Sequence, residues 1–223
     1  MSKTVLVVAA HADDEALGCG GALAKHVAAG DKVHVVFVAD GVTSRSGAGD
    51  EDLVRRQRAT ESARNILGIS TMAFLDLPDN RLDSLPLLDI VQPLEAIIGK
   101  LAPEIIYTHH YGDLNVDHRL AHQAVMTACR PLPGGTVREI LAFEVMSSTE
   151  WSSAGLAPFL PNYFVDISAH IEVKMQALDA YELEMRVPPH SRSIEHLRCL
   201  ANHRGYCVGV DAAEAFMVMR VLR

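Results

Sequence analysis

Histidine and aspartate side chains follow two apolar segments that lie far apart in the sequence. His11, Asp13 and Asp14 come directly after the first apolar run, and His118 follows a later run near residue 105. Imidazole and carboxylate groups are the ligands of a catalytic zinc site, which takes three protein ligands and keeps one position for water. His11 and Asp14 are three residues apart, so both side chains can point the same way at the start of a helix. These residues predict a metal site made of His11, Asp14 and His118.

The same residues also have a structural interpretation. Acidic residues commonly cap a helix or occupy its first turn, and His11 with Asp14 taken alone fit that role as well as metal binding. Asp13 is expected to stay beside the metal and to accept a proton from the water that the metal activates. His122 lies four residues after His118, and for His122 we favour packing or solvation over metal binding.

A sheet that brings both segments to one edge would assemble this site, and the apolar runs predict such a sheet. The five buried runs expected as strands cover residues 4–10, 32–39, 71–77, 104–108 and 140–145. The amphipathic segments expected as helices cover residues 15–29, 53–67, 87–101 and 117–129. The alternation predicts an α/β fold with a Rossmann-like, mostly parallel sheet and helices on both faces. Ligands of such sheets bind beyond the carboxyl ends of the strands, where His11 and His118 are expected.

Two further segments of the chain are irregular or mixed. Residues 40–52 are rich in glycine, serine and acids and are expected to form a loop. The last third is expected to contain a strand, a helix, a break at Pro188-Pro189, a second helix, and two short strands or one more helix, over residues 162–167, 171–186, 194–202, 205–210 and 216–222. We therefore expect a single domain over residues 1–223, with a core of about residues 1–145 and a C-terminal extension of helices and short strands over about residues 146–223.

Composition excludes several classes of protein. The chain has 223 residues, of which 49% are hydrophobic and 22% are charged, as in a globular protein. Lys and Arg number 20 against 28 Asp and Glu, and this net charge of −8 argues against nucleic acid as a partner. No stretch approaches about 18 apolar residues, so neither a membrane span nor a secretory signal is expected. The four cysteines form no CxxC pair, which predicts reduced thiols and a cytoplasmic location.

Three glycines, Gly18, Gly20 and Gly21, lie inside the first expected helix. They resemble part of a dinucleotide-binding fingerprint, but the phosphate-binding turn of that fingerprint must directly follow the strand. We therefore attribute them to close packing of the helix on the sheet.

Three motifs resemble those of the LmbE/PIG-L family of zinc-dependent N-deacetylases. Residues 10–15 read AHADDE where the family has AHPDDE, and residues 115–118 read NVDH where the family has HPDH or a variant. Residues 77–80 read LPDN, in further agreement. The similarity covers most of the chain. It implies action on N-acetylglucosaminyl and related amino-sugar groups.

The resemblance assigns roles to individual residues. It implies zinc binding by His11, Asp14 and His118, a general-base role for Asp13, and contacts to the substrate sugar by Arg56 and Asp79. Asp117, which precedes His118, could orient a metal ligand as a hydrogen-bond acceptor.

Two positions depart from the family pattern. Ala12 replaces the usual proline of the first motif, and Asn115 replaces the first histidine of the second, which in relatives is thought to stabilise the oxyanion. An asparagine amide can donate a hydrogen bond but has no proton to give. That role is therefore expected to fall to Asn115 itself or to His109, His110 or His190. The loop with His190 and Arg192 could close over the site and bind substrate, or merely connect two helices.

We therefore predict a metal-dependent hydrolase that removes the acetyl group from an N-acetylglucosamine-type amino sugar or its conjugate. A zinc-bound water would attack the amide, with Asp13 as general base. Two alternatives stay open: an amidase for a larger N-acyl or thiol-conjugate substrate, and a non-catalytic metal-holding protein that binds sugars. The expected partner is a small amino sugar, and a homo-oligomer is left open because relatives often assemble.

Overall fold

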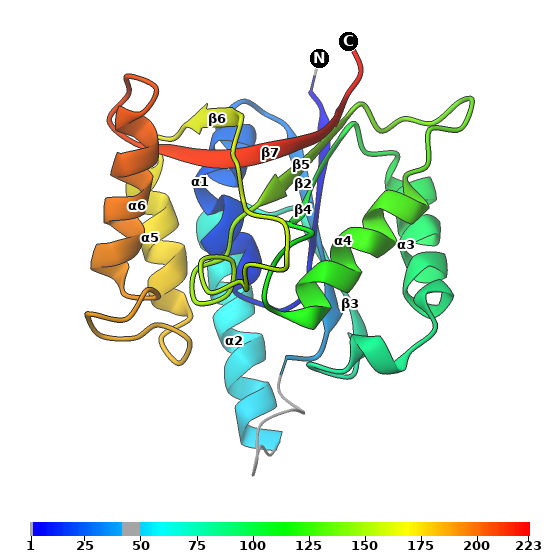
Figure 1. Cartoon of the computed structure of the whole chain (residues 1–223), viewed down its shortest axis with the longest axis horizontal. Coiled ribbons are helices and arrows are strands. Elements are labelled where there is room, and N and C mark those ends of the chain that lie inside the picture. The colour runs from blue at the N-terminus through cyan, green and yellow to red at the C-terminus, as the bar shows by residue number, and fades with distance from the viewer. Residues whose placement is uncertain (1, 42–49) are drawn as a thin grey trace.

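A computed structural model describes residues 2–41 and 50–223 of the chain. Among these residues, seven strands form one sheet in the order β3-β2-β1-β4-β5-β7-β6 (Figure 1). Their bounds are β1 Thr4–Ala9, β2 Lys32–Ala39, β3 Thr71–Leu77, β4 Ile105–His109, β5 Glu139–Phe143, β6 Tyr163–Asp166 and β7 Ala213–Val221. The first five strands pair in parallel, and β7 pairs antiparallel with β5 and β6. The predicted mostly parallel α/β sheet is confirmed.

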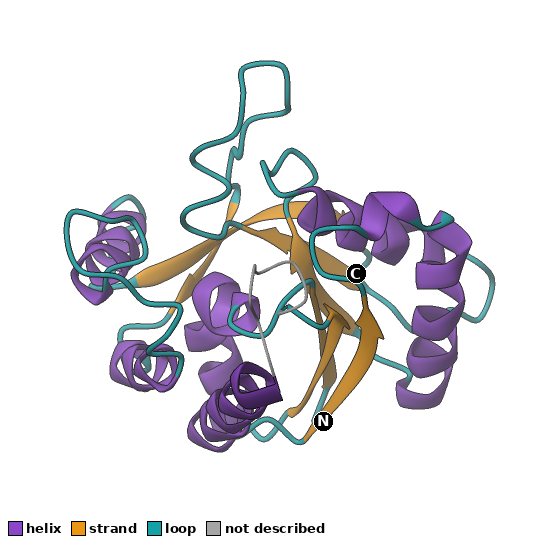
Figure 2. Ribbon diagram, turned by 90° about the horizontal axis from the view of Figure 1, so that it is seen from below, coloured by secondary structure: helices purple, strands orange, loops and turns teal. Residues whose placement is uncertain are grey.

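Helices cover both faces of this sheet, as Figure 2 shows. The helices are α1 Asp14–Ala28, α2 Asp50–Leu67, α3 Leu87–Leu101, α4 Val116–Ala128, α5 Ile171–Ala180 and α6 Ile194–Tyr206, with a short 3₁₀ helix, η1, at Leu82–Ser84. Strand side chains alternate between two apolar clusters, so Val5 and Val7 pack with α1 and α5, whereas Leu6 and Val8 pack with α3 and α4. Burial on both faces explains the continuous apolar runs over residues 5–9 of β1 and 35–39 of β2.

The last third differs in detail from the expected elements. The helix expected over 171–186 ends at Ala180, and residues 181–184 form a turn closed by the Glu184 N–H on the Tyr181 carbonyl. Residues 205–206 complete α6 instead of starting a strand, and β7 begins at Ala213. The loop expected over 40–52 is shorter, because α2 already begins at Asp50, and residues 42–49 of that expectation lie outside the described residues.

Helix α1 shows why glycines follow the first motif. A side-chain carbon on Gly18 would collide with the buried ring of Phe143, and one on Gly21 would lie 2.7 Å from Ile167. The helix is interrupted at Cys19, whose φ is −146°. Beyond the interruption, the N–H groups of Gly21 and Ala22 donate to the carboxylate of Glu214 on β7. Close helix–sheet packing is confirmed for Gly18, whereas Gly21 packs closely against Ile167, just after β6.

The parallel order of the strands places the first and second motifs side by side. Strands β1 and β4 are direct neighbours, and their carboxyl ends meet at one edge of the sheet. Both termini lie at the opposite edge, at the top of Figure 1. Of the helices that the structure describes, none has the length and apolar character needed to cross a membrane.

Candidate metal centre and active site

The loop after β1 and the start of α4 meet at this edge of the sheet. His11, Asp14 and His118 each offer a ligand atom there, and the three atoms lie within 4.8 Å of one another. His11 Nδ1 is 3.4 Å from Asp14 Oδ2, and His118 Nε2 is 3.5 Å from the same oxygen. Ligand bonds of about 2.0–2.1 Å place the donors of a tetrahedral ion about 3.3 Å apart. The three predicted ligands therefore have the spacing that a divalent cation needs.

Asp14 and His11 are oriented for this task. Asp14 Oδ1 is buried and has no hydrogen-bond partner among the residues that the structure describes, which is unusual for a carboxylate oxygen and is expected of a metal ligand. His11 Nε2 lies 3.0 Å from Asp79 Oδ1 and 3.1 Å from Asp117 Oδ2. These carboxylates hold the imidazole proton on Nε2, so the lone pair of Nδ1 faces Asp14. Asp117 thus orients His11, one of the three candidate ligands.

His118 is fixed by a separate carboxylate. Its Nδ1 lies 3.1 Å from Asp113 Oδ1, and Asp113 in turn accepts hydrogen bonds from the hydroxyls of Ser148 and Thr149. The ring of His109 stacks on His118 with 3.9 Å between the ring centroids. His109 Nε2 accepts from the N–H of Ala10 at 2.8 Å, so this nitrogen carries no proton. His109 therefore packs against the ring of His118.

The carboxylates make the centre attractive to positive charge. Burial disfavours the charged form of His118, but Asp14 and Asp113 outweigh it and raise the pKa of His118 to about 9. Burial likewise opposes charge on Asp14, yet His118 and His109 hold the pKa of Asp14 well below its usual value. A cation at this point would take over the stabilising role of the imidazolium charge.

Asp13 lies beside the cluster and is not used as a helix cap. It occupies the residue before α1, but its side chain makes no capping hydrogen bond. Its Oδ2 accepts from Arg192 Nη1 at 2.9 Å, and its Oδ1 is 3.9 Å from Arg56 Nη2. Burial raises the pKa of Asp13 to about 6, with Arg192 and Arg56 opposing the rise and Asp14 adding to it. A carboxylate with a pKa near neutrality suits proton transfer in both directions.

The backbone at Asp13 is strained. Its φ is 132°, a value that residues with a side chain rarely adopt. Conformations of this kind cost about 1–3 kcal/mol each and persist where surrounding contacts impose them. The strained backbone lowers local stability, and it directs the Asp13 carboxylate away from the helix end.

A polar cavity of about 150 Å³ opens above Asp13 and His11. Its walls include four of the predicted site residues, Arg56, Asp79, Asn115 and Arg192, together with Gly41, Asn80 and Glu184. Asn115 begins α4, and its Oδ1 accepts from the Asp117 N–H at 2.8 Å. Its amide nitrogen donates to Asn80 Oδ1 at 3.2 Å, so it can present a donor at the cavity wall.

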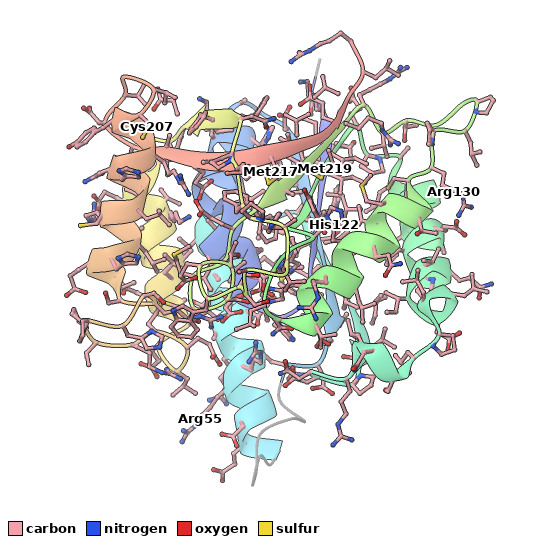
Figure 3. All side chains as sticks on the ribbon, viewed as in Figure 1. Arg55, His122, Arg130, Cys207, Met217 and Met219 are labelled. Atoms are coloured by element: carbon pink, nitrogen blue, oxygen red, sulfur yellow. The ribbon has the colours of Figure 1, made fainter. Side chains whose placement is uncertain are left out.

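Three histidines considered from the sequence lie apart from this cavity. His110 Nε2 is 2.8 Å from the Ala157 carbonyl oxygen, which directs that ring toward the loop after β5. His190 Nδ1 accepts from the Arg192 N–H at 3.0 Å, so it shapes the loop that carries Arg192. His122, labelled on α4 in Figure 3, has its Nδ1 2.8 Å from the His109 carbonyl oxygen.

Sequence reasoning assigned no role to several residues of the centre. Asp113 was only one of many polar residues after the fourth expected strand, and nothing in its spacing marks it as the partner of His118. Glu184 lay inside an expected helix, yet it reaches Arg56 Nη1 at 3.1 Å. Asn80 contributes its N–H to Asp117 at 2.7 Å. Only the motif of residues 77–80 could have drawn attention to Asn80.

The fold and the site together define a Rossmann-like α/β protein with a buried His/Asp centre for a divalent cation and a spare carboxylate beside it. Residues 6–129 match the PIG-L family, described as GlcNAc-PI de-N-acetylase, and the chain belongs to this family. The resemblance to the LmbE/PIG-L family is thereby confirmed.

Relatives with known or assigned activities extend over most of the chain. The Escherichia coli K12 protein YaiS, described as an uncharacterized deacetylase, is 32% identical over 81% of this chain and 91% of its own length. The diacetylchitobiose deacetylase of Thermococcus kodakarensis is 28% identical over 95% of this chain and 81% of its own. The solved structure of GalB, the 4-carboxy-2-hydroxymuconate hydratase of Pseudomonas putida KT2440, superposes with a TM-score of 0.78 at 24% identity, covering 99% and 98% of the two chains. This last likeness concerns the fold alone.

Proposed function

We propose that this protein removes the acetyl group from an N-acetylglucosamine-type amino sugar or its conjugate, with zinc held by His11, Asp14 and His118. The observation that carries the proposal is the carboxylate of Asp13 beside three ligand atoms that lie within 4.8 Å of one another. Zinc favours such mixed nitrogen and oxygen ligands, and the same set also accepts other divalent transition metals.

The chain supplies the proton transfers of amide hydrolysis. A bound divalent cation supplies Lewis-acid polarisation of the acetamide carbonyl. Asp13 accepts a proton from the attacking water as the new bond from oxygen to the carbonyl carbon forms. It then gives that proton to the amide nitrogen as the carbon–nitrogen bond breaks, because an unprotonated amine is a poor leaving group. The products are acetate and the free amino sugar.

The cavity walls offer the groups that a sugar needs. Asn115 Nδ2 is a hydrogen-bond donor at the wall, and it is our candidate for the oxyanion contact that a histidine makes in relatives. Arg56, Asp79 and Arg192 supply donors and acceptors for hydroxyl groups. In this proposal His110 and His190 lie behind the cavity wall and do not contact the substrate. Their ring nitrogens bind the Ala157 carbonyl and the Arg192 N–H instead.

The named substrate of the Thermococcus kodakarensis relative supports a GlcNAc-type substrate for this chain. A larger cavity of about 570 Å³ shares Arg56 and Glu184 with the reaction site. A substituent of a conjugated sugar that extends past Arg56 and Glu184 would reach this cavity.

Acetate release tests the proposal. The protein, stripped with a chelator and reloaded with zinc, is incubated with N-acetylglucosamine, N,N'-diacetylchitobiose and N-acetylglucosaminyl conjugates, and acetate is measured directly. We expect zinc-dependent acetate in equal amount to new free amine. Because the fold also occurs in a hydratase, loss of substrate alone is not sufficient. Turnover of N-hexanoyl sugars or thiol conjugates alone would favour the amidase alternative. Tight sugar binding without any acetate would favour the non-catalytic one.

We also propose a cytoplasmic location and one cooperative domain over residues 1–223. The four cysteines are free in the structure, and β7 of the C-terminal extension pairs with β5 of the core. A single unfolding transition in urea tests the domain proposal, and fractionation of the source cell tests the location. Light scattering during gel filtration decides whether the protein forms a homo-oligomer.

A further inference from the structure

Glu15 is a buried acid that the proposed reaction does not use. It follows Asp14 in the first motif, and it is 1% exposed to solvent. Its carboxylate accepts hydrogen bonds from two groups that are not candidate cation ligands. Oε2 accepts from the backbone N–H of Asp13 at 3.0 Å, and Oε1 accepts from the hydroxyl of Tyr181 at 2.7 Å.

The peptide group before Asp13 is held on both of its polar atoms. Its N–H donates to Glu15, and its oxygen, the carbonyl of Ala12, accepts from Arg56 Nη2 at 2.7 Å. The carbonyl of Asp13 itself accepts from the N–H groups of Ala16 and Leu17 at the start of α1. The backbone of Asp13 is thus fully bonded in a conformation with φ at 132°.

This arrangement differs from an ordinary helix start. In a capping box, a glutamate reaches back to the N–H of the capping residue, and the capping side chain bonds the helix in return. Asp13 does not return such a bond. The carboxylate of Glu15 accepts from the Asp13 N–H and so fixes the Asp13 backbone, while the Asp13 carboxylate makes no cap bond and lines the cavity.

We propose that Glu15, held in place by Tyr181, is a positioning residue that fixes the backbone of Asp13 and so directs its carboxylate at the substrate amide. The proposal rests on the proposed hydrolase function. Tyr181 comes from the C-cap of α5, so the C-terminal extension contributes to the position of a base that the core carries. Glu15 touches neither the cation ligands nor the cavity, and its effect passes through Asp13. A misplacement of about 1 Å costs on the order of 100-fold in rate.

Two substitutions of Glu15 distinguish the effect of its hydrogen bond with the Asp13 N–H from the effect of its negative charge. Glu15→Met keeps the length of the side chain but removes the acceptor for the Asp13 N–H. Glu15→Gln keeps the acceptor, since the amide oxygen accepts from the Asp13 N–H while the amide NH₂ donates to the Tyr181 oxygen. We expect kcat to fall about 100-fold in Glu15→Met, with KM and bound zinc near wild-type values, and to recover within about fivefold in Glu15→Gln. Equal damage by both substitutions would overturn the proposal.

A double-mutant cycle tests whether Glu15 acts through Asp13. In the Asp13→Asn background, Glu15→Met is expected to cause no further loss of the residual kcat. Multiplying losses would show that Glu15 acts independently and would contradict the proposal. Glu214→Gln is the matched control, because Glu214 also accepts from N–H groups of α1, at Gly21 and Ala22. It is expected to lower stability without the loss of kcat.

Hydrogen exchange gives a readout that needs no turnover. The Asp13 amide is expected to be protected in wild type and in Glu15→Gln, and to exchange faster in Glu15→Met while Gly21 and Ala22 remain protected. Absence of acetate release by wild type would refute the hydrolase function, and the exchange result would still decide the positioning role. If Glu15→Met does not fold, Tyr181→Phe is tested in its place. We expect the Asp13 amide to exchange faster in this variant. Unchanged exchange of the Asp13 amide together with an unchanged kcat would overturn the proposal.

Discussion

Arg192 donates a hydrogen bond to the carboxylate of Asp13 over 2.9 Å, across a separation of 179 residues in the chain. The same guanidinium donates through Nε to the carbonyl of Met146 just after β5, so two hydrogen bonds fix its position. The sequence predicted Arg192 as a contact for substrate. In the structure it also sets the electrostatic surroundings of Asp13, the proposed general base.

Removing this arginine is expected to change the pH dependence of the reaction. Burial raises the pKa of Asp13, and the positive charge of Arg192 lowers it. In Arg192→Met the pKa of Asp13 therefore rises, and more of the base is protonated at a given pH. The acidic limb of kcat/KM should move to higher pH, with a larger loss at pH 6 than at pH 8. Arg198→Met, which removes an exposed partner of Glu172, is the control and should leave the profile unchanged.

Asp13→Asn is expected to keep the cation and lose the reaction. An amide has no proton-accepting oxygen of sufficient basicity, so kcat should fall about 10²–10⁴-fold. Bound metal, measured by mass spectrometry, should stay near one equivalent because Asp13 is not among the three ligands. Asp179→Asn on the exposed side of α5 serves as control. Wild-type turnover by Asp13→Asn would refute the base assignment.

His118→Ala is expected to release the metal. Loss of one of three protein ligands leaves two, fewer than catalytic zinc sites use. His122→Ala removes a histidine from the same helix, α4, which binds a backbone carbonyl instead. Metal content after dialysis should fall in the first variant and persist in the second. Retention of the metal by His118→Ala would show that the ligand set is different.

Two glycines of α1 should respond in opposite directions to alanine. Gly18→Ala forces a methyl group into the buried ring of Phe143 and should cost about 1–3 kcal/mol of unfolding free energy. At Gly20 the nearest atom is 3.5 Å away, an ordinary contact. Gly20→Ala should therefore be neutral or stabilise by up to about 1 kcal/mol, because alanine favours helix. Urea unfolding of both variants measures the difference, and equal effects would contradict the packing argument.

Glu214→Ala should destabilise the protein strongly. Lys174 Nζ lies 2.5 Å from Glu214 Oε1, and each residue is 5% exposed. The substitution leaves a buried ammonium group and two N–H groups of α1 without their partner, at a cost of about 3–5 kcal/mol. Glu172→Ala, at an exposed ion pair with Arg198, should change stability little. A small effect at Glu214 would mean that water replaces the lost carboxylate.

The first five strands and the clustering of His11, Asp14 and His118 could be predicted from the sequence because both depend on local patterns. Continuous apolar runs indicate strands that are buried on both faces, and polar residues that follow them fall at one edge of a parallel sheet. His11 and Asp14 lie within one turn of the chain, so their proximity follows from their spacing. Only the placement of His118 beside them depends on how distant segments of the chain pair. The known order of α/β folds supplied that placement.

The surroundings of those ligands could not be predicted because they depend on long-range pairing. Asp113 faces His118, and Asp117 faces His11 instead of its neighbour His118. Which carboxylate serves which histidine follows from side-chain directions on α4 and in the loop before it. The end of α5 at Ala180 was also missed, since its apolar pattern continues while Tyr181 turns inward to Glu15.

Strand β7 lies between β5 and β6, although it is made after every other strand of the sheet. A growing chain that has left the ribosome as far as residue 145 already carries His11, Asp14 and His118. It still lacks Tyr181 and Arg192, the side chains that contact Glu15 and Asp13. The proposed cation ligands are therefore synthesised before the side chains that contact Glu15 and the proposed base, Asp13.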